Sequence, residues 1–487
     1  MFPGAHQRVG QRLCAHGRGY DRARRAPARS SKPGGAVAHI QQHHMQAAWH
    51  DMVSDTDTLA CEASLADKST IVCRTALLML ASGTGAWRTR DTLNRVARVL
   101  GITVHVDMGL ISLECTCFEG NDSLTEVVSL ATSGVNTHKI WLMERYLSEI
   151  EVLGHELTVR DFHLLLDEVE KVGPDYTPLQ LGLAAGFACG AFVFLLGGGP
   201  VEMLCALVGA GLGNFVRMLM LRRRIGQFSA VAGGVMVACV AYLVTLLGIS
   251  AATGGAAADH QAGYIDAMLF VIPGFPLITA GLDLAKLDMR SGIERLTYAV
   301  TIIALATLVG WLIASVVGLA PDDFAPLGLS PAVLLALRLA ASFVGVFGFS
   351  VMFSSPVRMA ATAGALGAVA NTLRLTLIDL PLYIPALGLA SGVPPEAAAF
   401  AGALTSGLLA AAVHRHATSY PRISLTVPAI VIMVPGLYMY RAIYYMCVFD
   451  TLGMMDWLVR AVLIVAFLPV GLGVARALTD PRWRHTS

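Results

Sequence analysis

The sequence is poor in charged residues. Asp, Glu, Lys and Arg make up 14% of its 487 residues, whereas soluble globular domains carry about 25%. Hydrophobic residues reach 55%, which excludes an ordinary soluble protein and is typical of a membrane protein. The formal net charge is only +1, which argues against a nucleic-acid-binding protein.

Several sequence motifs are also missing. None of the nine cysteines forms a C-x-x-C pair, so we predict neither a disulfide framework nor a zinc site. The sequence shows no nucleophile motif, phosphate-binding loop or metal-ligand spacing, so we predict no cofactor, no metal and no enzyme. The Arg-rich N-terminus has no apolar segment after it and is not a signal peptide. Residues 1–59 are predicted to be a disordered extension, with Met45 or Met52 as alternative starts.

Most of the charge lies before position 179, and residues 60–178 predict a small α+β domain. Its helical patterns are 69–80, 88–100, 138–152 and 158–172, and its strand-like runs are 102–108, 110–118 and 125–131. Gly101 is a natural helix end, and Thr158 with Asp161 predicts a capped helix start. Cys115 and Cys117 fall on one strand face and are interpreted as small buried hydrophobes. We expect a structural or regulatory domain, with a hydrolase as the alternative.

The rest of the chain predicts ten membrane spans, each long enough to cross roughly 30 Å of hydrocarbon. They are approximately 179–196, 200–220, 229–249, 264–282, 297–319, 332–353, 357–379, 395–413, 424–446 and 456–477. One set of connections is rich in Lys and Arg, and the other set has only Asp259, Asp322, Asp323 and Asp450. The positive-inside rule then places the N-terminal domain and both termini in the cytoplasm of a multi-pass protein, here of a bacterial inner membrane.

The ten spans divide into two halves, 179–319 and 320–487. Gly199-Pro200 opens span two and Ser355-Pro356 opens span seven, and an Asn-x-x-Arg motif follows each, at Asn214 and at Asn371. Pro273-Gly274 then interrupts span four, and Pro435-Gly436 interrupts span nine. Since five spans is an odd number, the second half must be inverted, which predicts two five-helix inverted repeats with broken helices, the architecture of alternating-access carriers.

Polar residues near the breaks are candidates for the transport site, because charges within spans are costly. Arg374 and Arg441 are candidate carboxylate clamps, and Thr279 and Asn371 could meet a hydroxyl group; Asn371 could equally bond two helices together. Asp266 could carry a coupling proton or lie at the outer mouth. Arg217 is expected to reach toward the interface, and Asp283 and Asp379 are expected to be solvated.

The sequence resembles the threonine/serine exporter family over about residues 70–478. The stretch from Ser82-Gly83 through Arg88, Asp91 and Thr92 is similar to the family's N-G-A-E-T-x-R-x-E-D-T, Ser133-Gly134-Val135-Asn136 to its R-G-V-N, and Pro174-x-Tyr176 to its P-x-Y-P. In the spans, the matching strings are Leu196-Gly197-Gly198-Gly199, Ile272-Pro273-Gly274 and Val434-Pro435-Gly436. Gly85 and Arg90 replace acidic residues of the first motif, which argues against catalysis by the domain.

This resemblance implies a cytoplasmic domain, ten spans and export of threonine and serine driven by the proton-motive force. The expected partners are the amino acid, protons and the lipid bilayer, with a homo-oligomer left open. We expect the binding site between spans four and nine, at Pro273, Gly274, Thr279, Asn371, Arg374, Pro435, Gly436 and Arg441, with Asp266 coupling the proton. The alternatives are a dicarboxylate exporter of the same fold, since relatives of the family are linked to such export, and a membrane-anchored hydrolase.

Overall fold

The computed structural model describes residues 53, 56–130, 134–173, 175–254, 260–321, 323–380, 393–416 and 420–484. Most of the predicted disordered extension, together with Ser133, Pro174, Asp259 and Asp322, lies outside these residues. The continuously described chain begins at Thr56. Its backbone bonds to the start of a helix near Thr158, with Ala60 N donating to Leu157 O at 2.9 Å and Val159 N to Thr58 O at 3.1 Å.

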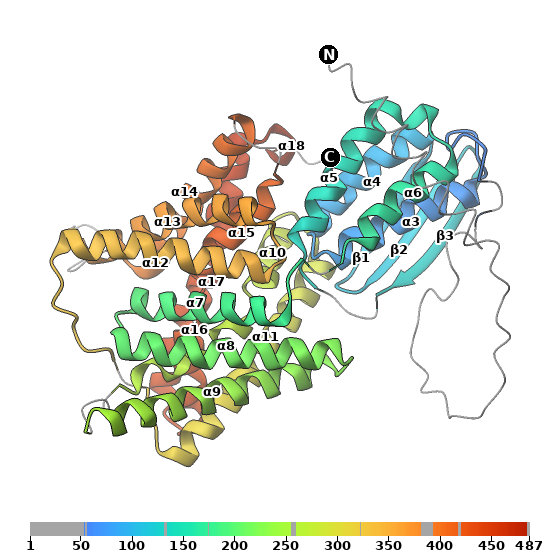
Figure 1. The fold of residues 1–487 in the computed structure, drawn as a ribbon. Coiled ribbons are helices and arrows are strands. Elements are labelled where there is room, and N and C mark those ends of the chain that lie inside the picture. Colours follow the sequence, from blue (N-terminus) through green and yellow to red (C-terminus); the bar gives the residue numbers. More distant parts are fainter. Residues whose placement is uncertain are drawn as a thin grey trace, which may run out of the picture.

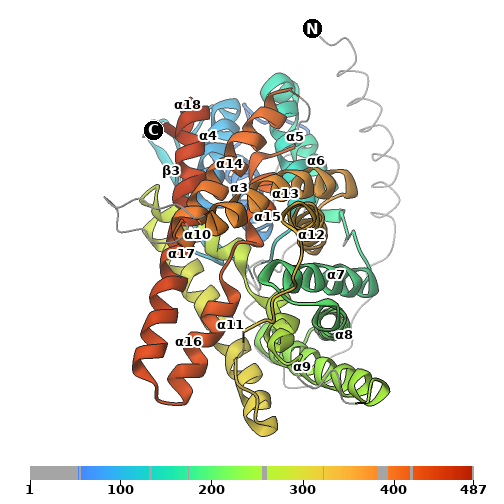
Figure 2. The same ribbon diagram turned by 90° about the vertical axis from the view of Figure 1, so that its left-hand side faces the viewer.

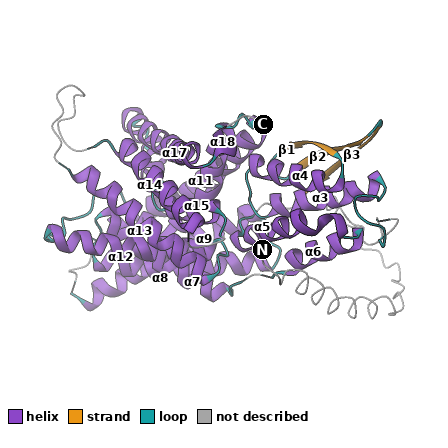
Figure 3. Ribbon diagram, turned by 90° about the horizontal axis from the view of Figure 1, so that it is seen from above, coloured by secondary structure: helices purple, strands orange, loops and turns teal. Residues whose placement is uncertain are grey.

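The N-terminal region is an α+β domain, as predicted. Its elements are α3 (Leu65–Ala81), α4 (Ala86–Leu100), β1 (Thr103–Met108), β2 (Ser112–Glu119), β3 (Asp122–Ser129), α5 (Thr137–Leu153), η1 (Gly154–Glu156) and α6 (Val159–Lys171). The strands form an antiparallel sheet in the order β1-β2-β3, with helices on one face (Figure 3). Cys115 and Cys117 of β2 are fully buried beneath α3, which confirms their interpretation as core residues.

Local sequence signals account for the ends of these helices. Gly101 ends α4 in the left-handed conformation, with φ at 71°, where a side chain would be strained. Thr158 and Asp161 form the predicted capping box at the start of α6: each side chain accepts the backbone N–H of the other residue. The structure confirms both predictions. They could be made from the sequence because each depends only on neighbouring residues.

The membrane region consists of long apolar helices beside the domain (Figure 1). They are α7 (Pro178–Leu196), α8 (Pro200–Arg222), α9 (Gln227–Ala252), η2 (Ala262–Val271), α10 (Gly274–Leu284), α11 (Met289–Val317), α12 (Pro331–Met352), α13 (Val357–Asp379), α14 (Pro395–His416), α15 (Arg422–Val431), α16 (Gly436–Cys447), α17 (Thr451–Thr479) and α18 (Pro481–Arg484). Among the described residues, eight helices could each cross a membrane, and ten spans result if each bent pair counts as one.

Helix α11 begins eight residues before the predicted span, at Met289 rather than 297. The added turns carry Arg290, Glu294 and Arg295, and these charged residues led hydropathy to exclude the turns from the predicted span. All three side chains contact the N-terminal domain. Figure 2 shows α12, α7, α8 and α9 stacked against one another, so the first helix of the second half packs on the first helix of the first half.

Candidate functional site

The two Pro-Gly breaks have nearly the same backbone geometry. Pro273 has φ/ψ of −79°/62° and Pro435 has −82°/60°. In each break the glycine N–H bonds to the carbonyl two residues earlier, Gly274 to Ile272 O at 2.8 Å and Gly436 to Val434 O at 2.9 Å. The helix pairs bend by 63° at the first break and by 49° at the second.

The two breaks pack against each other. A Cβ on Gly274 would lie 3.2 Å from Val431, and a Cβ on Gly436 would lie 2.4 Å from Ile272 Cδ1. The space left between them is about 20 Å³, which is about the size of one water molecule. The structure therefore brings spans four and nine together as predicted, and their junction is closed.

A larger cavity of about 850 Å³ lies on the side of the membrane region that faces the N-terminal domain, here called the domain side. Its wall includes Pro273 and Thr279 from the first broken span and Gly83 from the domain. Arg217 of α8, Arg224 just after α8 and Arg295 of α11 supply its positive charge. Thr279 is buried, and its hydroxyl donates to Phe275 O at 3.0 Å, which leaves the oxygen able to accept a further hydrogen bond.

Arg217 is a cavity residue that sequence reasoning assigned to the membrane interface rather than to the transport site. Its guanidinium donates to Asn214 Oδ1 at 3.3 Å, its Nε has no partner, and no carboxylate lies within ion-pair distance among the described residues. Arg295, in contrast, already pairs with Asp283, Nε to Oδ2 at 3.3 Å. The repeated Asn-x-x-Arg motif was the available signal, but it marks Arg374 equally well.

The other predicted residues lie away from this cavity. Arg441 pairs with Asp323 at 2.7 Å and stacks over Trp457, and Arg374 donates to Met433 O at 3.4 Å. Asn371 donates to Ser342 Oγ of α12 at 2.9 Å, so it does bond two helices. Pro273 and Thr279 are thus the predicted residues that the structure places on the cavity wall.

Asp266 lies neither at a mouth nor in water. Its side chain is fully buried, and neither carboxylate oxygen has a hydrogen-bond partner among the described residues. It lies close enough to Cys189, Tyr242 and Arg441 to interact electrostatically with each. A carboxylate without donors is very costly to bury, so the neutral, protonated form is the stable one here.

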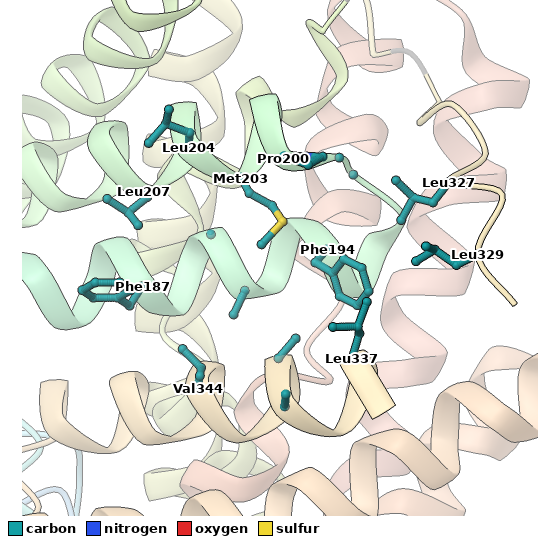
Figure 4. Close-up of a pocket in the computed structure, with 16 residues that line it drawn as sticks. Phe187, Phe194, Pro200, Met203, Leu204, Leu207, Leu327, Leu329, Leu337 and Val344 are labelled. Atoms are coloured by element: carbon teal, nitrogen blue, oxygen red, sulfur yellow. The ribbon is translucent and has the colours of Figure 1, made fainter. Parts of the chain in front are cut away.

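A second cavity, of about 700 Å³, lies between α7, α8 and α12 (Figure 4). Phe187, Phe194, Met203, Leu337 and Val344 point toward it, and its wall carries no charged side chain. A zwitterionic or anionic solute would lose its hydration there without gaining partners, so this cavity does not suit such a solute.

The N-terminal domain contacts the first half of the membrane region through a buried polar cluster. Asp283, at the end of α10, was expected to be solvated; that expectation is wrong, because the residue is 2% exposed. Its carboxylate accepts from Ala86 N at 2.9 Å and from Ser291 Oγ at 3.0 Å. Arg295 completes the cluster by donating to Thr84 O at 2.7 Å. Asp379, in contrast, is exposed as expected.

The same domain also contacts the second half. Thr137 N donates to Phe353 O at 2.9 Å, and the Thr137 hydroxyl lies 2.6 Å from the Ser355 hydroxyl. Near the C-terminus, the ring of Trp87 meets that of Trp483 at 5.0 Å, with Lys286 lying over both rings. Because the domain bonds to both halves, a rearrangement of one half against the other must change these contacts.

Removal of the Arg295 charge should separate the domain from α10. We expect Arg295→Met to lower stability by about 3 kcal/mol, because Asp283 is left buried without its cation. The measurements are the unfolding temperature in detergent and hydrogen exchange of Gly83–Ala86.

The matched control for this prediction is Arg290→Met. Arg290 pairs with Asp107, but both side chains are well exposed, so the loss should be at most about 1 kcal/mol. Equal losses in the two variants would contradict a structural role for the buried cluster.

Paired broken spans, with a polar cavity reaching one break and an unpaired carboxyl group in the core, define a class: a multi-pass α-helical membrane transporter. A threonine/serine exporter profile matches residues 70–318, and a second profile, described as Threonine/Serine exporter, ThrE, matches residues 338–478. The chain belongs to the threonine/serine exporter family.

Two curated proteins are similar to the chain. A Mycobacterium tuberculosis protein named "Probable threonine/serine exporter" is 26% identical over 433 residues, which is 84% of this chain and 76% of the relative. A Klebsiella aerogenes protein named "Probable succinate transporter subunit" is 24% identical over 250 residues, which is 49% of this chain and 89% of the relative. No solved structure matches the chain.

Proposed function

We propose that this protein exports threonine and serine by proton antiport with alternating access. The single observation that carries the proposal is the domain-side cavity, whose wall contains Thr279, the first break and Arg217, which has no ion-pair partner among the described residues. A hydroxy amino acid needs an anion acceptor for its carboxylate, carbonyls for its ammonium group and a hydroxyl partner. Arg217 would bind the carboxylate, and the backbone carbonyls that Pro273 leaves without an N–H donor would bind the ammonium group. The Thr279 hydroxyl would bind the substrate hydroxyl.

The orientation in the membrane belongs to the same proposal. The domain side carries Arg222, Arg223 and Arg224, and the opposite side, here called the far side, carries Asp323 and Asp450. The positive-inside rule makes the domain side cytoplasmic, together with both termini, in a bacterial inner membrane. The cavity then faces the compartment from which an exporter takes its substrate.

Several matched positions support the inverted repeat. Leu287 and Phe449 both have positive φ, at 63° and 61°, and each follows its break proline by 14 residues. Helices α11 and α17, which come next, both have 29 residues. Asn214 and Asn371 each bond to the preceding helix, the former to Leu181 O at 2.8 Å. Alternating access would exchange the environments of the two breaks.

Proteoliposomes provide the direct test. We expect labelled threonine to accumulate under an imposed pH gradient, and unlabelled serine to compete. A flux that ignores the gradient would reject antiport, and no flux of either amino acid would reject the substrate class.

Succinate belongs in the same assay because a succinate transporter subunit is among the relatives. Two carboxylates would favour the use of both Arg374 and Arg441. If Arg374→Gln and Arg441→Gln abolished succinate flux and spared threonine flux, the dicarboxylate alternative would replace the amino-acid proposal.

A further inference from the structure

Glu202 is a buried carboxylate at the far side that the substrate site does not use. It lies near the start of α8, whose other end carries Arg222 and reaches Tyr176 O on the domain side. Glu202 is only 4% exposed, and each of its carboxylate oxygens has a hydrogen-bond partner. Oε2 accepts the N–H of Gly199 at 3.1 Å, and Oε1 lies 2.6 Å from Nδ1 of His260.

His260 connects Glu202 to the protein surface and to the core. About a third of its side chain is exposed, so its ring can exchange protons with solvent. Its backbone carbonyl accepts the hydroxyl of Tyr242 at 2.9 Å, and Tyr242 is fully buried. Gly263 packs between them: a Cβ there would lie 2.8 Å from both Glu202 Cβ and the Tyr242 oxygen.

The helix geometry then leads from Gly263 to Asp266. Residues Ala262–Val271 form a 3₁₀ helix, so residues three apart lie on the same face, about 6 Å further along the axis. Asp266 is therefore one turn deeper than Gly263 on the face that meets Glu202 and Tyr242. The electrostatic interaction of Asp266 with Tyr242 agrees with this placement.

We propose that His260 and Glu202 form the far-side proton entrance that serves Asp266. His260 takes a proton from solution and passes it to the Glu202 carboxylate. When a water molecule enters between the two carboxylates, Glu202 passes the proton through it to the Asp266 carboxylate, which becomes neutral. Each transfer moves one proton and returns the donor to its earlier state. The inference rests on the proposed antiport and adds two residues to it.

Other titratable groups surround this route. Cys205 of α8 and Tyr242 of α9 lie beside Glu202, and Cys189 of α7 lies beside Asp266. Arg441 of α16 interacts electrostatically with Asp266 and pairs with Asp323. The thiols and the phenol hold their protons at neutral pH, which leaves His260, Glu202 and Asp266 as the groups that exchange them.

The test is Glu202→Gln in proteoliposomes. The amide can still accept from Gly199 N and bond to His260, but it cannot carry a proton. We expect pH-gradient-driven threonine flux to fall about tenfold or more, as for other lost proton-transfer groups. Exchange of labelled for unlabelled threonine without a gradient should stay near the wild-type rate. His260→Gln is the second variant and should behave in the same way.

Glu396→Gln is the matched control, since Glu396 also lies in the first turn of a membrane helix, α14, and should leave both rates unchanged. If Glu202→Gln spares the gradient-driven flux, or removes exchange as well, Glu202 is not a proton-transfer residue. If the wild type exchanges threonine but ignores the gradient, antiport itself fails, which is a different result.

Discussion

Replacement of Asp266 by Asn should uncouple transport from the proton gradient. We expect Asp266→Asn to reduce gradient-driven threonine flux about a hundredfold, because Asn copies the neutral carboxyl group and cannot release a proton. Exchange of threonine without a gradient should persist. The physical reason is the site itself: the carboxyl group is fully buried and has no hydrogen-bond donor among the described residues.

Stability gives a second readout for Asp266→Asn. Since the neutral form is the one that the core accepts, the variant should unfold at the wild-type temperature or above. Asp456→Asn is the control: Asp456 is half-exposed on α17 and pairs with Arg460 at 3.0 Å, so neither coupling nor stability should change appreciably. Gradient-driven flux that survives in Asp266→Asn would remove Asp266 from the mechanism.

Replacement of Arg217 by Gln should weaken substrate binding from the domain side. A hydrogen bond to a charged group contributes about 1.5–3 kcal/mol, so the apparent KM for threonine should rise about 10- to 100-fold. Arg217→Lys should recover only part of the affinity, because an ammonium group cannot hold a carboxylate with two parallel bonds. The measurement is the initial rate of export against internal threonine concentration.

Arg374→Gln is the matched control for this prediction. Arg374 occupies the same place in an Asn-x-x-Arg motif and contacts Met433 O rather than the cavity. If Arg374→Gln or Arg441→Gln raised the KM and Arg217→Gln did not, the carboxylate clamp would be where the sequence first suggested it. The substrate would then bind deeper than the domain-side cavity.

Features that depend on neighbouring residues could be predicted from the sequence. The Thr158 capping box, the end of α4 at Gly101 and the breaks at Pro273 and Pro435 all follow from local backbone chemistry. The pairing of spans four and nine followed from the similarity of the two halves. Helix lengths were less accurate where polar turns extend beyond the membrane, as at Met289.

The sequence could not predict which polar residues are buried, which are paired and which face solvent. Asp283 was expected in water because it ends a span, but the N–H of Ala86, 197 residues earlier in the chain, meets it in the buried cluster. Arg441 pairs with Asp323, which lies 118 residues earlier, and its position after the break does not indicate this contact. Arg217 and Arg374 share one motif and have different surroundings.

The sequence by itself determined that this chain crosses the membrane many times and that two spans break at Pro-Gly. Both depend on local properties, the length of apolar runs and the steric limits of proline. Only the tertiary structure decided which charged side chains form ion pairs and which line the cavity. It also decided that the Asp266 carboxyl group is buried without a hydrogen-bond partner among the described residues. Those outcomes depend on how each helix is rotated and on partners far away in the chain, which the local sequence does not specify.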